Sequence, residues 1–215
     1  MILTYLGHSC FKIQDKVGQE GITIVTDPFG KSVGLKVPNF EASIITISHN
    51  HHDHDNAQAL RGQPYIINTA GEYDIAGVMV EGIESYHDMK SGAERGKNIM
   101  YRIEVDDIAI VHLGDLGHIL DNKQLEKLEN TDILLIPVGG IYTLDAKKAV
   151  EVVSQIEPRI VIPMHYKLPG SKIINLDGVD KFIKEMGVKS TEEEKLKISK
   201  KDLPAEDMEL VVMKI

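Results

Sequence analysis

The chain has 215 residues, with 24 basic and 33 acidic side chains, so its formal net charge is −9 when histidine is neutral. This acidic balance argues against a broad nucleic-acid surface, because such surfaces draw their affinity from clustered lysine and arginine. No apolar run reaches the ~20 residues of a membrane span, and the single cysteine excludes a disulfide within the chain. With no secretory signal at the N-terminus, we expect a cytoplasmic protein that folds as one domain over residues 1–215.

Short runs of apolar and β-branched residues predict a series of strands in the first half of the chain. These runs are residues 2–6, 10–14, 22–26, 43–48, 65–68, 77–81, 99–105 and 108–113. The run 43–48 is apolar without alternation, which is typical of a buried strand. A short helix is expected over residues 56–60.

The second half of the chain alternates predicted helices with predicted strands. Helices are expected over residues 121–129, 145–156 and 179–186, and strands over residues 133–138, 160–164 and 208–214. Asp145 is the expected N-cap of the middle helix, and Gly187 ends the last one. Strands followed by strand–helix units predict two sheets covered by helices.

The strongest local pattern is His49-Asn50-His51-His52-Asp53-His54, which fits H-x-H-x-D-H. Imidazole and carboxylate groups are ligands that suit zinc and neighbouring divalent metals. In an extended segment, residues two apart point to the same side, so His49 and His51 can bind one ion. A turn would then direct Asp53 and His54 to a second ion, while His52 points away. The alternative is a solvated polar loop that is rich in histidine.

Three further polar residues each follow an apolar run, where the carboxyl ends of strands collect ligands. They are His87, Asp115 and His165. Taken singly, they also fit a surface loop, a turn and a core histidine, respectively. His112 is an alternative to His87, although strand alternation would place it and Asp115 on different faces.

The ordered set of motifs resembles the metallo-β-lactamase superfamily nearly end to end. The set comprises the 49–54 motif, His87, Gly114-Asp115 and His165. Leu6-Gly7-His8-Ser9-Cys10-Phe11, Asp27-Pro28-Phe29, Gly114-Asp115-Leu116-Gly117-His118 and Ile162-Pro163-Met164-His165-Tyr166 further resemble a branch of short hydrolases. That branch is similar to the phosphorylated-ascorbate lactonases and the N-acyl-phosphatidylethanolamine phospholipases. The resemblance implies an α/β fold, a four-layer αββα sandwich of two mixed β-sheets flanked by helices.

The same resemblance implies a dinuclear centre of two zinc ions, with manganese as the alternative metal. One ion would be held by His49, His51 and His87. The other would be held by Asp53, His54 and His165, and Asp115 would bridge the two.

Other residues are expected around this centre. Asp27 suits the role of orienting a ligand imidazole, and the resemblance makes His8 a neighbour of the site. Tyr166 adjoins His165 and is expected to meet substrate, or else to line the rim of a pocket. Asp53 is expected to orient the attacking water or accept its proton, and His118 to protonate the leaving group.

The polar segment 88–98 carries two glycines and follows a proposed ligand. It is expected to be a mobile lid whose Arg95 or Lys97 meets an anionic substrate, or else an ordinary surface loop. Replacement of Asp88 is expected to have little effect.

The predicted function is hydrolysis of an ester, lactone or phosphoester bond in a small anionic molecule by metal-bound hydroxide. One alternative is an RNA-processing nuclease of the same superfamily. The other is a non-hydrolytic protein that binds metal or carries a diiron redox site, although diiron relatives tend to have a carboxylate where His51 stands.

Overall fold

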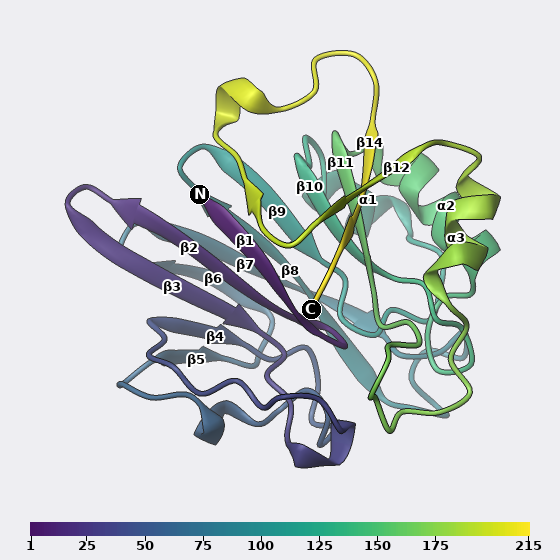
Figure 1. Ribbon diagram of the computed structural model, residues 1–215, viewed down its shortest axis with the longest axis horizontal. Helices are drawn as coiled ribbons and strands as arrows, with labels where there is room; N and C mark the ends of the chain where they lie inside the picture. The colour runs from purple at the N-terminus through teal and green to yellow at the C-terminus, as the bar shows by residue number, and fades with distance from the viewer.

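Two mixed β-sheets form the centre of the computed structural model, which describes residues 1–215 (Figure 1). The six-stranded sheet has the order β13-β1-β2-β3-β4-β5. Its strands are β1 (Ile2–Gly7), β2 (Cys10–Val17), β3 (Glu20–Thr26), β4 (Ile44–Thr46), β5 (Tyr65–Ile67) and β13 (Leu196–Lys197). Strands β1 to β3 pair antiparallel, whereas β3, β4 and β5 are parallel.

The eight-stranded sheet has the order β12-β14-β11-β10-β9-β8-β7-β6. Its strands are β6 (Gly71–Ile75), β7 (Val78–Tyr86), β8 (Lys97–Val105), β9 (Ile108–His112), β10 (Ile133–Pro137), β11 (Ile160–Met164), β12 (Ser190–Glu193) and β14 (Glu209–Met213). Strands β6 to β9 are antiparallel, and the remaining pairs are parallel. Every residue of β9, β10 and β11 is buried, as expected for parallel strands covered on both faces.

One core of 45 buried residues joins the two sheets. Successive side chains of a strand point to opposite faces, and the six-stranded sheet follows this rule. Ile24 and Ile44 belong to the shared core, whereas their neighbours Val25 and Ile45 belong to a smaller cluster on the outer face.

The α-helices cover the eight-stranded sheet on one side of the molecule (Figure 1). They are α1 (Asn122–Lys127), α2 (Ala146–Ile156) and α3 (Val179–Met186). Asp145 caps α2 as expected, since its side chain accepts a hydrogen bond from the Lys148 backbone N–H at 3.0 Å. None of these helices has the length and apolar character that a membrane crossing requires.

The outer face of the six-stranded sheet is covered by loops and two 3₁₀-helices rather than by α-helices. These are η1 (Lys31–Val33) and η2 (Ala57–Ala59), and Val33 and Ala57 pack on the smaller outer cluster. The short helix expected over residues 56–60 is the single 3₁₀ turn η2. In the segment between β3 and β4, which contains η1, proline and glycine prevent a regular helix.

Three strands were not predicted from the sequence: β6, β12 and β13. All lie at sheet edges and expose most of their side chains, so they lack the apolar alternation that predicts a strand. Residue 77, expected in a strand, instead lies in the turn between β6 and β7. Ala76 and Gly77 have φ angles of 51° and 79° there.

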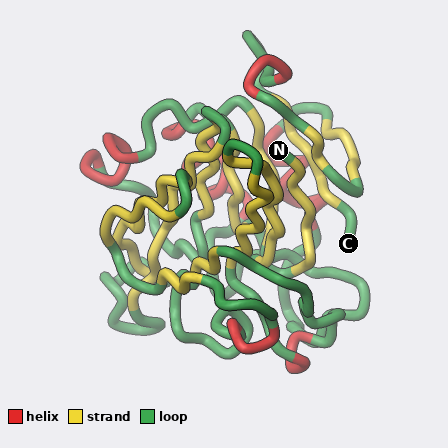
Figure 2. The backbone as a smooth tube through the Cα atoms, turned by 90° about the vertical axis from the view of Figure 1, so that its left-hand side faces the viewer, coloured by secondary structure: helices red, strands yellow, loops and turns green.

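Six strands carry a polar residue directly or shortly after their carboxyl end: β1, β3, β4, β7, β9 and β11. Within each sheet these strands run in the same direction, so their carboxyl ends meet at one edge. Figure 2 shows that much of the loop backbone gathers at one end of the strands. The fold thus brings polar side chains from distant parts of the chain to one edge.

Tyr101 of β8 links the two sheets close to this edge. Its buried hydroxyl lies 2.8 Å from the carbonyl oxygen of Ile47 and 3.0 Å from that of Ile67. Tyr101→Phe should lower the free energy of unfolding by about 1–2 kcal/mol, because one buried hydrogen-bond donor is lost. Urea denaturation measures this change, with Tyr65→Phe at an exposed ring as the control. Equal stability of the two variants would contradict the link.

Candidate metal centre

The histidine-rich segment leaves β4 through a turn that is fixed by Asp27. The Ser48 backbone N–H and hydroxyl donate to the two carboxylate oxygens of Asp27, at 2.8 and 2.6 Å. The His54 N–H then donates to the His51 carbonyl at 2.8 Å, which closes the turn. The side chain of His52 is 73% exposed and points away from the cluster, as the sequence predicts.

Three imidazole rings converge on one carboxylate oxygen of Asp115. The Nε2 atoms of His54, His87 and His165 lie 3.3, 3.1 and 3.2 Å from Asp115 Oδ2. His49 Nε2 lies 3.9 Å from the same oxygen. These residues come from the ends of four different strands.

The remaining predicted ligands complete two neighbouring groups. The metal-binding atoms of His49, His51 and His87 all lie within 4.8 Å of one another. In the second group, Asp53 Oδ2 lies 3.8 Å from His54 Nε2, and the His54 and His165 rings stack with centroids 5.9 Å apart. The structure therefore brings together all seven residues that the sequence proposed as ligands.

Unpartnered buried atoms show that this cluster fits a cation. His49 Nε2 and Asp115 Oδ1 are buried without a hydrogen-bond partner. His54 Nδ1 lies 2.9 Å from Asp27 Oδ2, so Nε2 is the ring nitrogen that faces the Asp115 carboxylate and is available to a metal. A divalent cation would give both the imidazole nitrogens and the carboxylate oxygens the partner that they lack. A donor set of imidazole and carboxylate without thiolate suits zinc or manganese.

Burial keeps several of these imidazoles neutral, which is the form that binds metal. Burial, together with the nearby His54, lowers the pKa of His49 to about 3. Burial and the nearby His165 lower the pKa of His8 to about 4. Burial would also lower the pKa of His54, but the carboxylates of Asp115 and Asp27 more than offset it and hold that pKa well above its usual value.

Asp27 lies behind the cluster, as expected for a residue that orients an imidazole. Its carboxylate is fully buried and fixes the tautomer of His54 through Nδ1. Two further residues that hold candidate ligands in place were not predicted from the sequence. Ser48 lies 2.9 Å through its hydroxyl from His49 Nδ1, and its position as the first polar residue after β4 is a signal that could have found it.

Asn98 is the other missed support, and it positions Asp115. Its buried amide donates to the Leu113 carbonyl at 2.9 Å and to the Ser85 hydroxyl at 2.8 Å, while its oxygen accepts the Asp115 N–H at 2.9 Å. This role could not be predicted, because Asn98 closes a polar segment that is typical of a loop.

Three residues proposed from the sequence have other partners. His118 uses both ring nitrogens on backbone groups, since Nε2 accepts the Tyr86 N–H at 3.1 Å and Nδ1 lies 2.8 Å from the Ile119 carbonyl. This geometry argues against its role as a proton donor. The Tyr166 hydroxyl is directed to the Met213 carbonyl at 3.5 Å, in the core rather than toward substrate. His112, the alternative to His87, lies 2.8 Å from the Ser9 carbonyl through Nε2.

The loop over residues 88–97 is organised around Asp88, contrary to expectation. The Asp88 side chain is only 6% exposed and accepts the backbone N–H groups of Lys90, Gly92, Glu94 and Arg95 at 2.7–3.0 Å. Burial would raise the pKa of Asp88, but these N–H donors hold it below its usual value. Replacement of Asp88 should therefore disturb the loop rather than have little effect.

The family model described as the beta-lactamase superfamily domain matches residues 2–165, which is most of the chain. The chain belongs to this superfamily. The crystal structure of a Thermotoga maritima protein, described as a Zn-dependent hydrolase of the metallo-β-lactamase superfamily, has 36% sequence identity and a TM-score of 0.78. That comparison covers 99% of this chain and 97% of the other.

Two curated relatives are named UPF0173 metal-dependent hydrolases. The Thermococcus onnurineus protein is 30% identical over 190 residues, covering 75% of this chain and 83% of its own length. The Carboxydothermus hydrogenoformans protein is 27% identical over 195 residues, covering 77% and 84%, respectively. Together with the histidine cluster, these relatives identify the chain as a metal-dependent hydrolase. The more specific likeness to lactonases stays a prediction.

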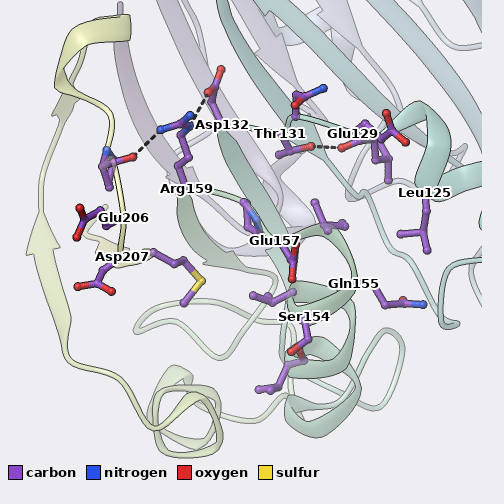
Figure 3. Close-up of a pocket in the computed structure, with 18 of the residues that line it drawn as sticks. Leu125, Glu129, Thr131, Asp132, Ser154, Gln155, Glu157, Arg159, Glu206 and Asp207 are labelled. Atoms are coloured by element: carbon purple, nitrogen blue, oxygen red, sulfur yellow. Dashed lines mark hydrogen bonds and ion pairs between the residues drawn. The ribbon is translucent and has the colours of Figure 1, made fainter.

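A cavity of about 440 Å³ opens beside His49 and His51 of the hydrolase. Asn68, Arg95 and Lys97 also line it. A second cavity of about 1190 Å³ lies at the amino ends of β10 and β11, where Asp132 and Arg159 face each other (Figure 3). It contains neither histidine nor cysteine. The smaller cavity is therefore the candidate substrate site.

Asp27→Asn tests how far the metal centre depends on the carboxylate behind His54. An amide is a weaker acceptor for the His54 ring and for Ser48, so we expect metal affinity to fall about 10–100-fold. Competition with a chromophoric chelator measures this change. Asp55→Asn removes the same charge from an exposed position in the same segment and should leave affinity unchanged. A similar loss in both variants would indicate a general charge effect.

Proposed function

We propose that the hydrolase uses two divalent metal ions to cleave an ester, lactone or phosphoester bond in a small anionic substrate. The convergence of three Nε2 atoms on Asp115 Oδ2 supports this proposal most strongly. His49, His51 and His87 would hold the ion at a first metal position. Asp53, His54 and His165 would hold the ion at a second metal position, with Asp115 shared between the two. Zinc fits this donor set, and manganese is the alternative.

Divalent ions held by these residues would supply a nucleophilic hydroxide near neutral pH and positive charge that stabilises the oxyanion formed during hydrolysis. Asp53 is the carboxylate suited to orient the attacking water and accept its proton. Its side chain is 16% exposed, compared with 3% for Asp115 and none for Asp27. Of these three carboxylates, Asp53 therefore has the best access to solvent and substrate.

The preference for an anionic substrate rests on Arg95. Lys97 in the same cavity is paired with Glu84 at 3.1 Å, whereas Arg95 has no carboxylate partner. The Arg95 guanidinium lies 4.9 Å from the centroid of the Tyr142 ring and donates to the Ile141 carbonyl at 3.4 Å. Asp88 accepts the Arg95 N–H and so fixes the loop that presents it. The arrangement offers one preoriented positive charge beside the metal centre.

Metal stoichiometry tests the dinuclear proposal. Isothermal titration of the chelator-treated chain with Zn²⁺ should saturate at two ions per chain. Asp115→Ala should lower metal affinity by at least tenfold, because it removes the only ligand that both positions share. Asp74→Ala, at an exposed position of β6, should bind two ions with unchanged affinity. Saturation of the wild-type chain at one ion would contradict the proposal.

Arg95→Ala tests the charge of the substrate. Loss of a charge-assisted hydrogen bond worth about 1.5–3 kcal/mol should lower kcat/KM for anionic substrates roughly 10–100-fold. Neutral substrates should be little affected, so the readout is the ratio of the two rates on anionic and neutral p-nitrophenyl esters. Arg61→Ala, at an exposed arginine away from the cavity, provides the matched control. An equal loss for both substrate types would exclude charge recognition by Arg95.

A further inference from the structure

His8 occupies a strained and firmly held position in the turn between β1 and β2. Its φ angle is 56°, and Gly7 before it has a φ angle of 104°. The His8 carbonyl accepts hydrogen bonds from the His165 N–H at 2.8 Å and from the Tyr5 hydroxyl at 2.7 Å. A left-handed backbone in a residue other than glycine costs of the order of 1 kcal/mol, and such strain clusters at functional sites.

The imidazole of His8 points into the second metal position. Its Nε2 atom lies 3.1 Å from Asp53 Oδ2 and 3.1 Å from His54 Nε2. The ring centroid lies 4.2 Å from that of His165. The metal-binding atoms of His8, His54 and His165 all lie within 4.8 Å of one another, as do those of the first metal position.

A hydrogen bond does not account for both contacts of His8 Nε2. This nitrogen either donates a proton to Asp53 or accepts one from His54, so in each case one of the two contacts is left without a hydrogen bond. A bound cation displaces any proton from His54 Nε2, since Nδ1 of that ring lies at hydrogen-bond distance from Asp27. A cation between His8, His54 and Asp53 accounts for all three atoms, because each then supplies a lone pair.

We infer that His8 is a ligand of the second metal position, which makes the two metal positions unequal. This inference rests on the dinuclear centre proposed above. The second position would have five protein ligands, His8, Asp53, His54, Asp115 and His165, of which His8, His54 and His165 are at most 2% exposed. The first position would have four protein ligands, including His51, which is exposed and lines the cavity with Arg95.

This inequality assigns different roles to the two ions. Metal sites filled by protein ligands are structural, whereas catalytic sites keep a position open for water or substrate. The second position is the filled one and would bind its ion more tightly. The first position borders the cavity, so the substrate would meet the ion held by His49, His51 and His87.

His8→Gly tests this ligand in the full-length chain. Glycine adopts the same left-handed backbone without strain and leaves room for a free imidazole molecule. Titration with Co²⁺ reports both the affinity of each ion and, through the visible absorption, its coordination. We expect His8→Gly to weaken one of two Co²⁺ ions by at least tenfold, to change the absorption of that ion, and to regain both properties when imidazole is added. His52→Ala, at an exposed histidine in the same cluster, should match the wild-type chain.

Unchanged affinity and absorption in His8→Gly would overturn the inference. A weaker ion whose absorption is unchanged, or which imidazole does not restore, would also overturn it and would leave His8 as a hydrogen-bond donor that positions Asp53. If the wild-type chain binds only one Co²⁺ ion, the dinuclear proposal itself fails. Should His8→Gly not fold, His8→Asn gives the affinity and absorption readouts without the imidazole rescue, because asparagine tolerates a left-handed backbone.

Discussion

The buried carboxylate of Asp115 is the constraint that organises this molecule. A charge removed from water costs several kcal/mol unless it is paired, and Asp115 is only 2% exposed. Burial would raise the pKa of Asp115, but His165 and His54 hold it well below its usual value. The fold surrounds the carboxylate with imidazoles from several strands and leaves one of its oxygens without a partner. A metal centre is the arrangement that balances these charges.

Some of the residues around the candidate metal centre have a strained backbone. Asp27 and His165 have φ angles of 38° and 51°, and both directly follow a buried strand. Each such residue costs of the order of 1 kcal/mol. The strands beneath them offset this cost, since β11 is buried at every position and β3 is buried over its last residues. The rigid core therefore holds in place a site that local preferences alone would not form.

The chemistry of a cavity, rather than its volume, identifies the substrate side of the hydrolase. The cavity of about 1190 Å³ is lined by apolar side chains, carboxylates and the Asp132–Arg159 ion pair, and contains no histidine (Figure 3). The cavity of about 440 Å³ offers two candidate ligand histidines, His49 and His51, and an arginine without a carboxylate partner. Asp88 links the histidine cluster to this smaller cavity. It directly follows His87 in the chain, and it also fixes the loop that carries Arg95.

The sequence by itself determined the elements that bury apolar surface and pointed to most of the candidate ligands. Strands β9, β10 and β11 are continuous apolar runs, and the 49–54 segment contains donors at a spacing that only metal binding explains well. Edge strands such as β6 and β12 could not be predicted, because their pairing depends on a neighbour rather than on their own pattern.

Only the tertiary structure decided which polar residues support the site. His118 and Tyr166 lie next to ligand-bearing motifs in the sequence, yet the fold directs them to backbone carbonyls and the core. Asn98 is far from most of the candidate ligands in the sequence, yet it contacts Asp115. His8 was expected near the site, but only the fold shows that its ring contacts His54. Proximity along the chain does not determine where a side chain points after a strand has paired. That direction follows from strand register and from the turn that each strand enters.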